Sequence, residues 1–388
     1  MLKLPPLSLY IHVPWCVKKC PYCDFNSHRI TGDIPEDAYI KALLNDFENE
    51  LPSVQGRPIH SIFIGGGTPS LLTANAYQKL FKGLQARVVF SDDIEITMEA
   101  NPGTYEHDRF QAYLDAGVNR LSLGVQSFQD EKLAALGRIH CAGEARQAIA
   151  SITSHGFSNI NINIDLMHGL PGQSPDDALY DLKQAIDLQP AHISWYQLTI
   201  EPNTVFYSKT PALPPDDTLW DIQEAGQALL ASAGFQQYEI SAYSQPGRRS
   251  KHNLNYWQFG DYIGIGAGAH GKLTDISTGQ IYRNWKTRMP ADYLAADHYI
   301  SHAFESGRRV LEADELPIEF MMNVLRLHDG AETQLYVERT GQTLGDISRQ
   351  LHLAQQQGLL EPVLAENNRL KPTSTGRLFL NDLLELFA

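Results

Sequence analysis

The sequence predicts an α/β fold, a partial (β/α)6 barrel followed by a smaller, mainly helical C-terminal domain. Short apolar runs alternate with amphipathic helical patterns from residue 7 to about residue 200, and this alternation is typical of parallel β/α units. The pattern contains six such units, fewer than the eight that close a full barrel. A doubly wound sheet is the competing arrangement, and periodicity alone leaves it open.

The expected strands are rich in Ile, Leu, Val and Thr, and several are too apolar to face water. They cover Leu7–Val13, Ser61–Gly65, Ile94–Glu99, Leu121–Gln126, Ile160–Met167 and His192–Ile200. The helices expected between them cover Glu36–Leu51, Ala74–Ala86, Tyr105–Ala116, Gly143–His155 and Pro175–Leu188. Because a helix separates each strand from the next, we expect the strands to run parallel.

The pattern changes after residue 204. A proline-rich connection precedes an expected helix at Asp216–Ala233, and an aromatic, glycine-rich region follows it to about Gly271. From about residue 311 the pattern is mostly helical. We therefore divide the chain into a barrel at residues 1–235, a linking region at 236–310 and a C-terminal helical domain at 311–388.

The composition of the 388 residues, 43% hydrophobic and 20% charged, is that of an ordinary globular protein. The formal net charge of -14 disfavours a nucleic-acid partner, since phosphate binding needs clustered positive charge. No signal peptide and no transmembrane stretch is apparent, and three of the four cysteines lie in one motif, which fits a reducing compartment. We expect a cytoplasmic protein that reaches the inner face of a membrane only through a partner.

Three cysteines near the N-terminus, Cys16, Cys20 and Cys23, form a CxxxCxxC motif. Cubane iron–sulfur clusters are normally held by four Cys thiolates, so three ligands leave one iron open to a non-protein ligand. The motif therefore predicts a [4Fe-4S] cluster that takes part in chemistry or ligand exchange. A zinc site is an alternative, but structural zinc prefers CxxC pairs with two further ligands, and only His12 and His28 lie close by. Unrelated core thiols are a weaker alternative, because the three cysteines fall within eight residues.

Polar residues recur at the ends of the expected strands, where ligands collect in parallel β/α folds. Burying so many polar groups for stability alone would cost desolvation free energy. The residues are Tyr10 in the first strand, Gly66, Gly67 and Thr68 after the second, Glu99 in the third, Gln126 in the fourth, Arg138 one short helix later, and Asp165 in the fifth.

Each of these residues also has an ordinary structural explanation. The glycines fit a tight turn as well as a close backbone approach to a ligand. Glu99 fits a hydrogen-bonded strand end, or a partner for ribose hydroxyls or an ammonium group. Arg138 and Asp165 can form an ion pair, or the Arg138 fork can hold a carboxylate. Taken together with the cysteines, they favour a ligand that contains a sulfonium group on an open cluster.

These motifs resemble the radical S-adenosylmethionine (SAM) proteins of the anaerobic coproporphyrinogen oxidase family. The resemblance spans nearly the whole chain and rests on CxxxCxYC, GGGTP, Met-Glu-Ala-Asn-Pro-Gly around Glu99 and Gly-Val-Gln-Ser around Gln126. It implies a radical-SAM barrel and a [4Fe-4S] cluster on Cys16, Cys20 and Cys23, whose fourth iron is chelated by the amino and carboxyl groups of SAM. It also implies a SAM site lined by Tyr10, Gly66, Gly67, Thr68, Glu99, Gln126, Arg138 and Asp165.

Two departures resemble the HemW-type branch of this family, the haem chaperones. Coproporphyrinogen dehydrogenases have another cysteine two positions after the third ligand, where this chain has Phe25. They also carry an N-terminal extension, whereas here the first strand is expected almost at Met1. The segment from His252 to Trp257 matches the HNxxYW signature of the branch.

His252 is the haem-site residue that we expect, chiefly from this resemblance. Imidazole is a common axial ligand of haem iron, and the aromatic residues around His252 could pack against a porphyrin face or form ordinary core. His270 and His140 are weaker alternatives. Cys141 is expected to be a bystander thiol.

Two functions follow from the resemblance. The first is a haem chaperone that passes haem to a membrane-bound acceptor such as a respiratory cytochrome subunit, with the cluster and SAM in a structural or regulatory role. The second is an oxygen-independent coproporphyrinogen III dehydrogenase that uses a 5′-deoxyadenosyl radical from SAM. Phe25 and the HNxxYW segment favour the chaperone. We therefore expect the protein to lack coproporphyrinogen oxidase activity. An electron carrier is disfavoured because it has no use for an open cluster, and a homodimer is compatible with the sequence.

Overall fold

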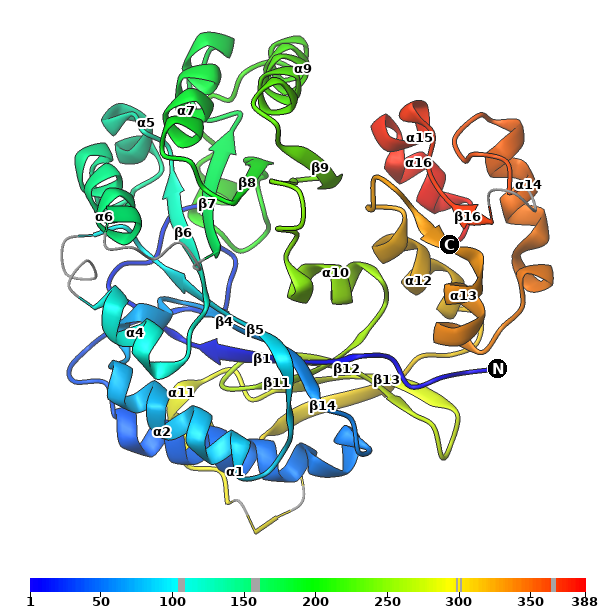
Figure 1. Ribbon diagram of the computed structural model, residues 1–388, viewed down its shortest axis with the longest axis horizontal. Helices are drawn as coiled ribbons and strands as arrows, with labels where there is room; N and C mark the ends of the chain where they lie inside the picture. The colour runs from blue at the N-terminus through cyan, green and yellow to red at the C-terminus, as the bar shows by residue number, and fades with distance from the viewer. Residues whose placement is uncertain (104–108, 155–160, 298, 301, 364–367) are drawn as a thin grey trace.

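The computed structural model describes residues 1–103, 109–154, 161–297, 299–300, 302–363 and 368–388. Within these residues one 12-stranded sheet has the order β14-β13-β12-β11-β1-β4-β5-β6-β7-β8-β10-β9. Figure 1 shows this sheet curling around the short helix α10 (Lys251–Trp257), with the C-terminal domain to one side. The concave face of the sheet therefore faces α10.

Six parallel strands form the middle of the sheet. They are β1 (Leu7–Val13), β4 (Ile59–Gly66), β5 (Phe90–Ala100), β6 (Arg120–Gln126), β7 (Asn161–His168) and β8 (His192–Gln197). Their apolar side chains, such as Leu9, Ile64 and Leu123, belong to the core shared with the helices. The residues that alternate with them, such as Ser8, Thr97 and Asn163, are buried on the opposite face of the sheet. The arrangement confirms the predicted partial (β/α)6 barrel.

Helices cover the outer face of these strands, and a large apolar core lies between helices and sheet. The helices are α1 (Glu36–Val54), α2 (Ala74–Gln85), α4 (Phe110–Ala116), α6 (Ala142–Ser154), α7 (Pro175–Asp187) and α9 (Asp216–Ser232). Side-chain caps begin α2 at Thr73 and α7 at Ser174. Residues 105–108 and 155 of two expected helices, and residue 160 of an expected strand, lie outside the described residues.

Shorter elements connect the barrel. They are β2 (Trp15–Cys16), β3 (His28–Arg29), η1 (Pro69–Leu71), α5 (Asp130–Ala135), α8 (Val205–Ser208), β9 (Gln236–Glu239) and β10 (Ala242–Ser244). β8 ends at Gln197, three residues before the expected Ile200. The chain leaves the strand there because the next residue, Leu198, packs in a small apolar cluster with Met167 and Phe206.

The region 236–310 extends the same sheet, which the sequence did not predict. β11 (Asp261–Ile265) pairs parallel with β1, and β12 (His270–Asp275), β13 (Gln280–Lys286) and β14 (Glu305–Val310) continue antiparallel. The helix α11 (Pro290–Leu294) lies between β13 and β14 in the chain. The expected boundaries at residues 235 and 310 stay predictions.

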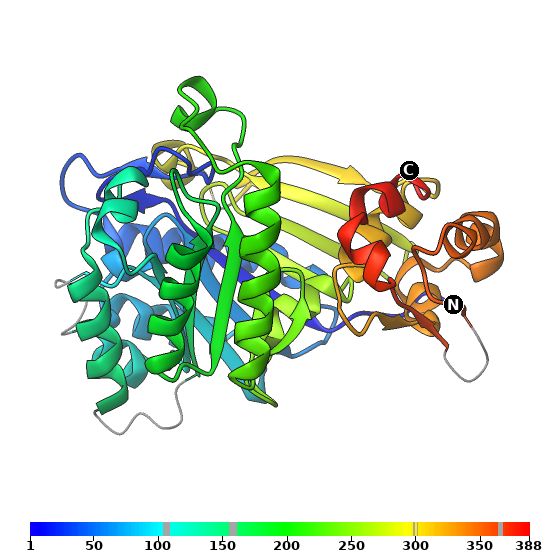
Figure 2. The same cartoon turned by 90° about the horizontal axis from the view of Figure 1, so that it is seen from above.

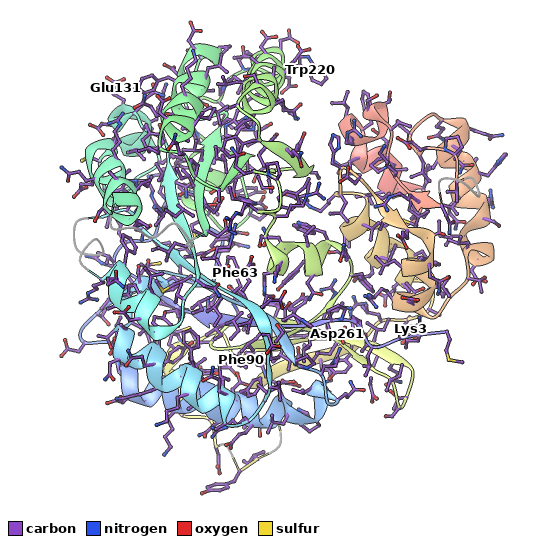
Figure 3. All side chains as sticks on the ribbon, viewed as in Figure 1. Lys3, Phe63, Phe90, Glu131, Trp220 and Asp261 are labelled. Atoms are coloured by element: carbon purple, nitrogen blue, oxygen red, sulfur yellow. The ribbon has the colours of Figure 1, made fainter. Side chains whose placement is uncertain are left out.

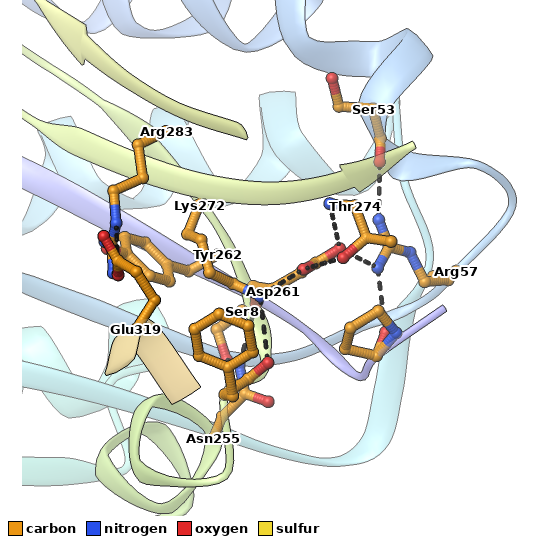
Figure 4. A network of polar contacts seen from close by, with 12 residues as sticks. Ser8, Ser53, Arg57, Asn255, Asp261, Tyr262, Lys272, Thr274, Arg283 and Glu319 are labelled. Carbon is orange, nitrogen blue, oxygen red and sulfur yellow. Dashed lines mark hydrogen bonds and ion pairs between the residues drawn. The ribbon is translucent and has the colours of Figure 1, made fainter. Parts of the chain in front are cut away.

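A buried polar network fixes β11 and α10 to the sheet (Figure 4). The Asp261 carboxylate accepts hydrogen bonds from Arg57 Nη1 at 2.7 Å and from Thr274 N and Oγ1 at 2.9 Å. Asn255 of α10 donates from Nδ2 to the Asp261 carbonyl and to Ser8 Oγ on β1, both at 2.9 Å. The network therefore ties α10 to β1 and β11 at once.

The C-terminal domain is mainly helical, as predicted, and has its own apolar core. It contains α12 (Leu316–Val324), β15 (Ala331–Glu332), α13 (Thr333–Thr340), η2 (Leu344–Ile347), α14 (Ser348–Gln356), β16 (Arg369–Leu370), α15 (Ser374–Leu378) and α16 (Leu380–Glu385). Figure 2 shows it as a separate body beside the barrel. Every helix within the described residues is too short or too polar to span a bilayer.

Candidate functional site

The cysteine loop follows β1 at the carboxyl edge of the parallel strands. Its three cysteines are free thiols, with Cys16 buried and Cys20 and Cys23 half-buried. Burial raises the pKa of the Cys16 and Cys23 thiols, so a metal that binds them must displace their protons.

The glycine turn after β4 holds the cysteine loop against the sheet. Gly67 N donates to Val13 O and Thr68 N donates to Trp15 O, each at 2.7 Å. A Cβ at Gly67 would lie only 2.4 Å from Trp15 O, so this close backbone approach requires glycine. Gly66 has φ 110, and a Cβ there would lie 2.6 Å from the His12 ring. The glycines therefore serve the packing of the loop as well as any ligand.

One cavity of about 530 Å³ opens between the cysteine loop, the strand ends and α10. This volume is within the usual range for small-molecule sites. Ten of the twelve residues predicted as ligands line it: Cys16, Cys20, Cys23, Gly66, Gly67, Thr68, Glu99, Gln126, Arg138 and Asp165. The other two, Tyr10 and His252, do not.

Tyr10 lies one layer below this cavity. Its hydroxyl is hydrogen-bonded to His12 Nδ1 at 3.0 Å, and its ring stacks on Phe63 with 6.4 Å between centroids. Phe63, labelled near the middle of Figure 3, itself lines the cavity. Tyr10 therefore supports the cavity wall through Phe63.

Two half-buried carboxyls, Glu99 of β5 and Asp165 of β7, line the cavity at the strand ends. Burial and the charge of Asp165 raise the pKa of Glu99 to about 8, although the Gly66 N–H donates to Glu99 Oε2 at 3.3 Å. Burial also raises the pKa of Asp165, against hydrogen bonds from Ser122 Oγ at 2.8 Å and Asn163 Nδ2 at 2.7 Å. The pair thus favours a ligand that brings positive charge or hydrogen-bond donors.

Arg138 joins the cysteine loop to the strand ends. Its Nη1 donates to Cys20 Sγ at 3.6 Å, and its Nη2 donates to Asn101 Oδ1 at 2.6 Å and Gly124 O at 2.7 Å. Arg138 is held by these contacts and forms no ion pair with Asp165, which was one of the two alternatives that the sequence left open. Gln126 has φ 70, an unusual backbone conformation for a non-glycine residue at a site, and accepts from Tyr196 OH at 2.9 Å.

His252 is buried under the concave face rather than exposed in the cavity. Only 3% of its surface is accessible, its Nδ1 is hydrogen-bonded to Ser61 Oγ at 3.0 Å, and its ring packs against Phe63 and Tyr256. Burial and the charge of Arg120 lower the pKa of His252 to about 3. The imidazole is therefore neutral.

Glu95 on β5 anchors the N-terminus of the helix that carries His252. Its carboxylate accepts from Ser250 Oγ at 3.2 Å and from the backbone N–H groups of Lys251 and His252 at 3.1 Å. An acceptor with negative charge is favourable at this end of a helix. Arg120, 2% exposed, lies 4.0 Å from the same carboxylate.

The C-terminal domain contributes to the same cavity through Arg326. Its guanidinium lies 4.3 Å above the Trp257 ring of α10 and donates to Glu239 Oε2 at 3.2 Å. Trp257 Nε1 is buried without a hydrogen-bond partner among the described residues. All three residues line the cavity, so both parts of the protein shape it.

Several lining residues were not predicted. Asn101 follows β5 directly, so its place at a strand end was a usable signal. Tyr196 and Ser122 come from β8 and β6. Glu239 ends β9 and Arg326 lies in the turn after α12, and neither position carried a local signal in the sequence.

The residues present fit an iron–sulfur cluster and a cationic cofactor. Three thiols line the cavity, and Arg138 Nε is a buried donor without a hydrogen-bond partner among the described residues. Over the same described residues, no three His, Cys, Asp or Glu side chains converge closely enough to share one metal ion. A cubane cluster has no such requirement, because each thiolate binds a different iron.

Six parallel β/α units with a three-cysteine loop at their carboxyl edge are the arrangement of radical SAM proteins. A sequence profile described as the radical SAM superfamily matches residues 10–185, and one described as the HemN C-terminal domain matches residues 311–379. The structure of Escherichia coli coproporphyrinogen III oxidase (HemN), described as a radical SAM enzyme, is similar with a TM-score of 0.80. It covers 99% of this chain and 90% of that chain at 23% identity, so the likeness shows the fold.

Full-length relatives define the family more narrowly. The haem chaperone HemW of Escherichia coli K12 is 55% identical over 100% of this chain and 99% of its own length. HemW of Haemophilus influenzae is 51% identical over the same shares, and HemW of Bacillus subtilis is 34% identical over 87% of this chain and 88% of its own. The chain therefore belongs to the HemW haem-chaperone family of radical SAM proteins.

Proposed function

We propose that the protein is a cytoplasmic haem chaperone that binds a [4Fe-4S] cluster, SAM and haem, and delivers haem to an acceptor. The observation that carries the proposal is the shared cavity, where three thiols, two carboxyls and the HNxxYW helix meet. The family membership supports the haem part, because the relatives are named haem chaperones. A respiratory haem subunit in the membrane is the proposed acceptor, and a homodimer stays open to measurement.

Cys16, Cys20 and Cys23 would hold the cluster. Arg138, through its contact with Cys20, would offset part of the negative charge that the thiolates bring into a buried site. When bound, such a cluster with an open iron supplies a coordination position for an exchangeable ligand.

SAM would bind along the strand ends. Glu99 and Asp165 would accept hydrogen bonds or face its positive charge, and Gly66 to Thr68, Gln126 and Arg138 would fix its orientation. Tyr10 would act from below through Phe63. SAM would then favour one conformation of the chaperone over another by binding it more tightly.

The cluster assignment is tested by anaerobic reconstitution of single Cys→Ser variants. We expect Ser at any of the three motif positions to remove most of the bound iron and the visible charge-transfer absorption. Cys141→Ser is the matched control, because Cys141 is an exposed thiol outside the cavity lining. Equal iron loss in the control would defeat the assignment.

The haem assignment is tested by titrating the reconstituted protein with haem and following the Soret band. We expect tight binding that requires the α10 region, so that Trp257→Ala weakens it. His252→Ala tests the predicted ligand, which is buried beneath Tyr256 and must be uncovered to reach iron. A protein that binds no haem but converts coproporphyrinogen III to protoporphyrinogen would be the dehydrogenase instead.

A further inference from the structure

A second cavity of about 490 Å³ lies on the concave side next to the first. Phe25, two residues after Cys23, lines both cavities. The other walls come from Tyr10 on β1, Tyr256 on α10, His270 on β12 and Trp285 on β13. The HNxxYW helix thus faces the first cavity with Trp257 and the second with Tyr256.

The sheet itself forms the floor of this second cavity. In the strand register, Tyr10 lies opposite Gly264 of β11, and His270 lies opposite Trp285. Residues opposite each other in register project from the same face of a sheet. Gly264 contributes no side chain between Tyr10 and His270, and a Cβ there would lie 2.1 Å from the His270 carbonyl. A hollow flanked by aromatic rings results.

His270 is the imidazole of this cavity that is available to a ligand. It is exposed, and its ring nitrogens form no hydrogen bond with any described residue. His12, which also lines the cavity, is engaged at both nitrogens, by Tyr10 and by Asn26 O. Partial burial of the ring and the nearby charges of Arg283 and Arg288 lower the pKa of His270, which keeps the ring in the form that binds metals.

The charge on the rim suits an anionic group. Arg288 is exposed, lines the cavity and forms no ion pair with a carboxylate among the described residues. Lys286 is already paired with Asp46 and Glu50, at 2.7 and 2.6 Å. Asp24 is the single carboxylate among the described lining residues.

We propose that this second cavity is the haem site, with His270 as an axial ligand, the aromatic rings against the macrocycle and Arg288 facing a propionate. The proposal rests on the proposed function, because it assumes that the protein binds haem. Aromatic walls, one free imidazole and one free guanidinium match an amphipathic metalloporphyrin. Asn26 of the cysteine loop donates from Nδ2 to Ala267 O at 3.0 Å and to Arg288 O at 2.8 Å, so the haem site and the cysteine loop are mechanically connected.

Haem titration of the anaerobically reconstituted full chain tests this assignment. We expect His270→Ala to weaken haem binding by about tenfold or more. Even the loss of a residue that only hydrogen-bonds to a metal ligand lowers metal affinity by about that factor. His270→Met should keep haem but shift the Soret band, because thioether is an alternative axial ligand. His352→Ala is the control, an exposed histidine of α14 in the C-terminal domain, and iron content shows whether each variant has retained its cluster.

The outcomes separate this inference from the proposed function. If both His270 variants keep the wild-type affinity and spectrum while His252→Ala loses them, the second-cavity assignment is wrong and the chaperone proposal stands. If the wild-type protein binds no haem, the proposed function fails first.

Discussion

Glu99 makes SAM binding depend on pH in a direction that the structure fixes. Burial and Asp165 raise the pKa of Glu99 to about 8, so near neutral pH the carboxyl carries a proton. A ligand that presents an ammonium group or hydroxyl donors to Glu99 requires the carboxylate. Binding therefore releases the proton, and affinity should rise with pH until it levels off above about 8.

The size of this pH dependence follows from the release of one proton for each SAM molecule bound. Below the pKa of Glu99, each fall of one pH unit should weaken SAM binding by up to about tenfold, or about 1.4 kcal/mol. Glu99→Gln removes this dependence and, at pH above 8, should weaken SAM binding by about 1–3 kcal/mol, the usual penalty for stranding hydrogen-bonded groups. Protonation of SAM itself affects its binding to the wild type and to Glu99→Gln equally. The difference between their two binding curves against pH therefore reports the titration of Glu99 alone.

The same group sets a stability window. The native state binds more protons at Glu99 than the unfolded chain between the ordinary pKa of 4.5 and about 8. Its stabilising contribution is complete below 4.5 and is lost as pH rises through about 8. Without SAM, Glu99→Gln should therefore be the more stable protein above that pH.

Equilibrium dialysis of SAM at a series of pH values, with iron content checked in each sample, measures the first effect. Thermal unfolding of the same samples measures the second. Parallel pH dependences in the wild type and Glu99→Gln would refute the assignment of Glu99 to the ligand.

Two further perturbations test how the loop and helix are held. Gly67→Ala places a Cβ 2.4 Å from Trp15 O and should destabilise the protein by about 1–3 kcal/mol with reduced iron retention; wild-type retention would contradict the packing role. Glu95→Ala leaves Arg120 buried without its carboxylate and α10 without its anchor, and should lower the free energy of unfolding by about 3–5 kcal/mol in urea denaturation. Glu95→Gln, which keeps an acceptor for the helix, should lose less, and equal losses would show that the helix contacts are unimportant.

The parallel core was predictable because apolar residues recur along its strands and helical patterns separate the strands. In β1, Leu7, Leu9, Ile11 and Val13 alternate with polar or aromatic residues, and the structure places the strand at the predicted Leu7–Val13. Such alternation marks a strand, and the helices between the strands fix their direction.

β11 to β14 were not predicted because several buried residues of β11 to β13 are polar, and β14 has no buried residue. Asp261, Lys272, Asn284 and Lys286 are all 2% exposed or less, each supported by partners from distant segments such as Glu50. Local hydrophobic periodicity cannot reveal a strand whose inward side chains are charged. Whether such a segment forms a strand depends on the neighbouring strand with which it pairs.

The sequence located most of the first cavity, because strand ends converge in this fold. Tyr10 was expected there but lies outside its lining. His252, expected at a haem site, is buried beside Ser61 and Phe63. Depth along a strand and burial of a helix face are tertiary properties that the sequence does not reveal. Arg326 was missed because its place depends on how the C-terminal domain packs against α10. The ligand roles of all these residues stay predictions.

Haem transfer is the measurement that tests the central claim most directly. Haem-loaded, reconstituted protein is mixed with membranes that contain the apo form of a respiratory haem subunit, and the Soret bands of donor and acceptor are followed. We predict that haem leaves the chaperone and appears in the acceptor, while coproporphyrinogen III added with SAM is not converted. Retention of haem by the donor, together with formation of protoporphyrinogen and 5′-deoxyadenosine, would contradict the chaperone function.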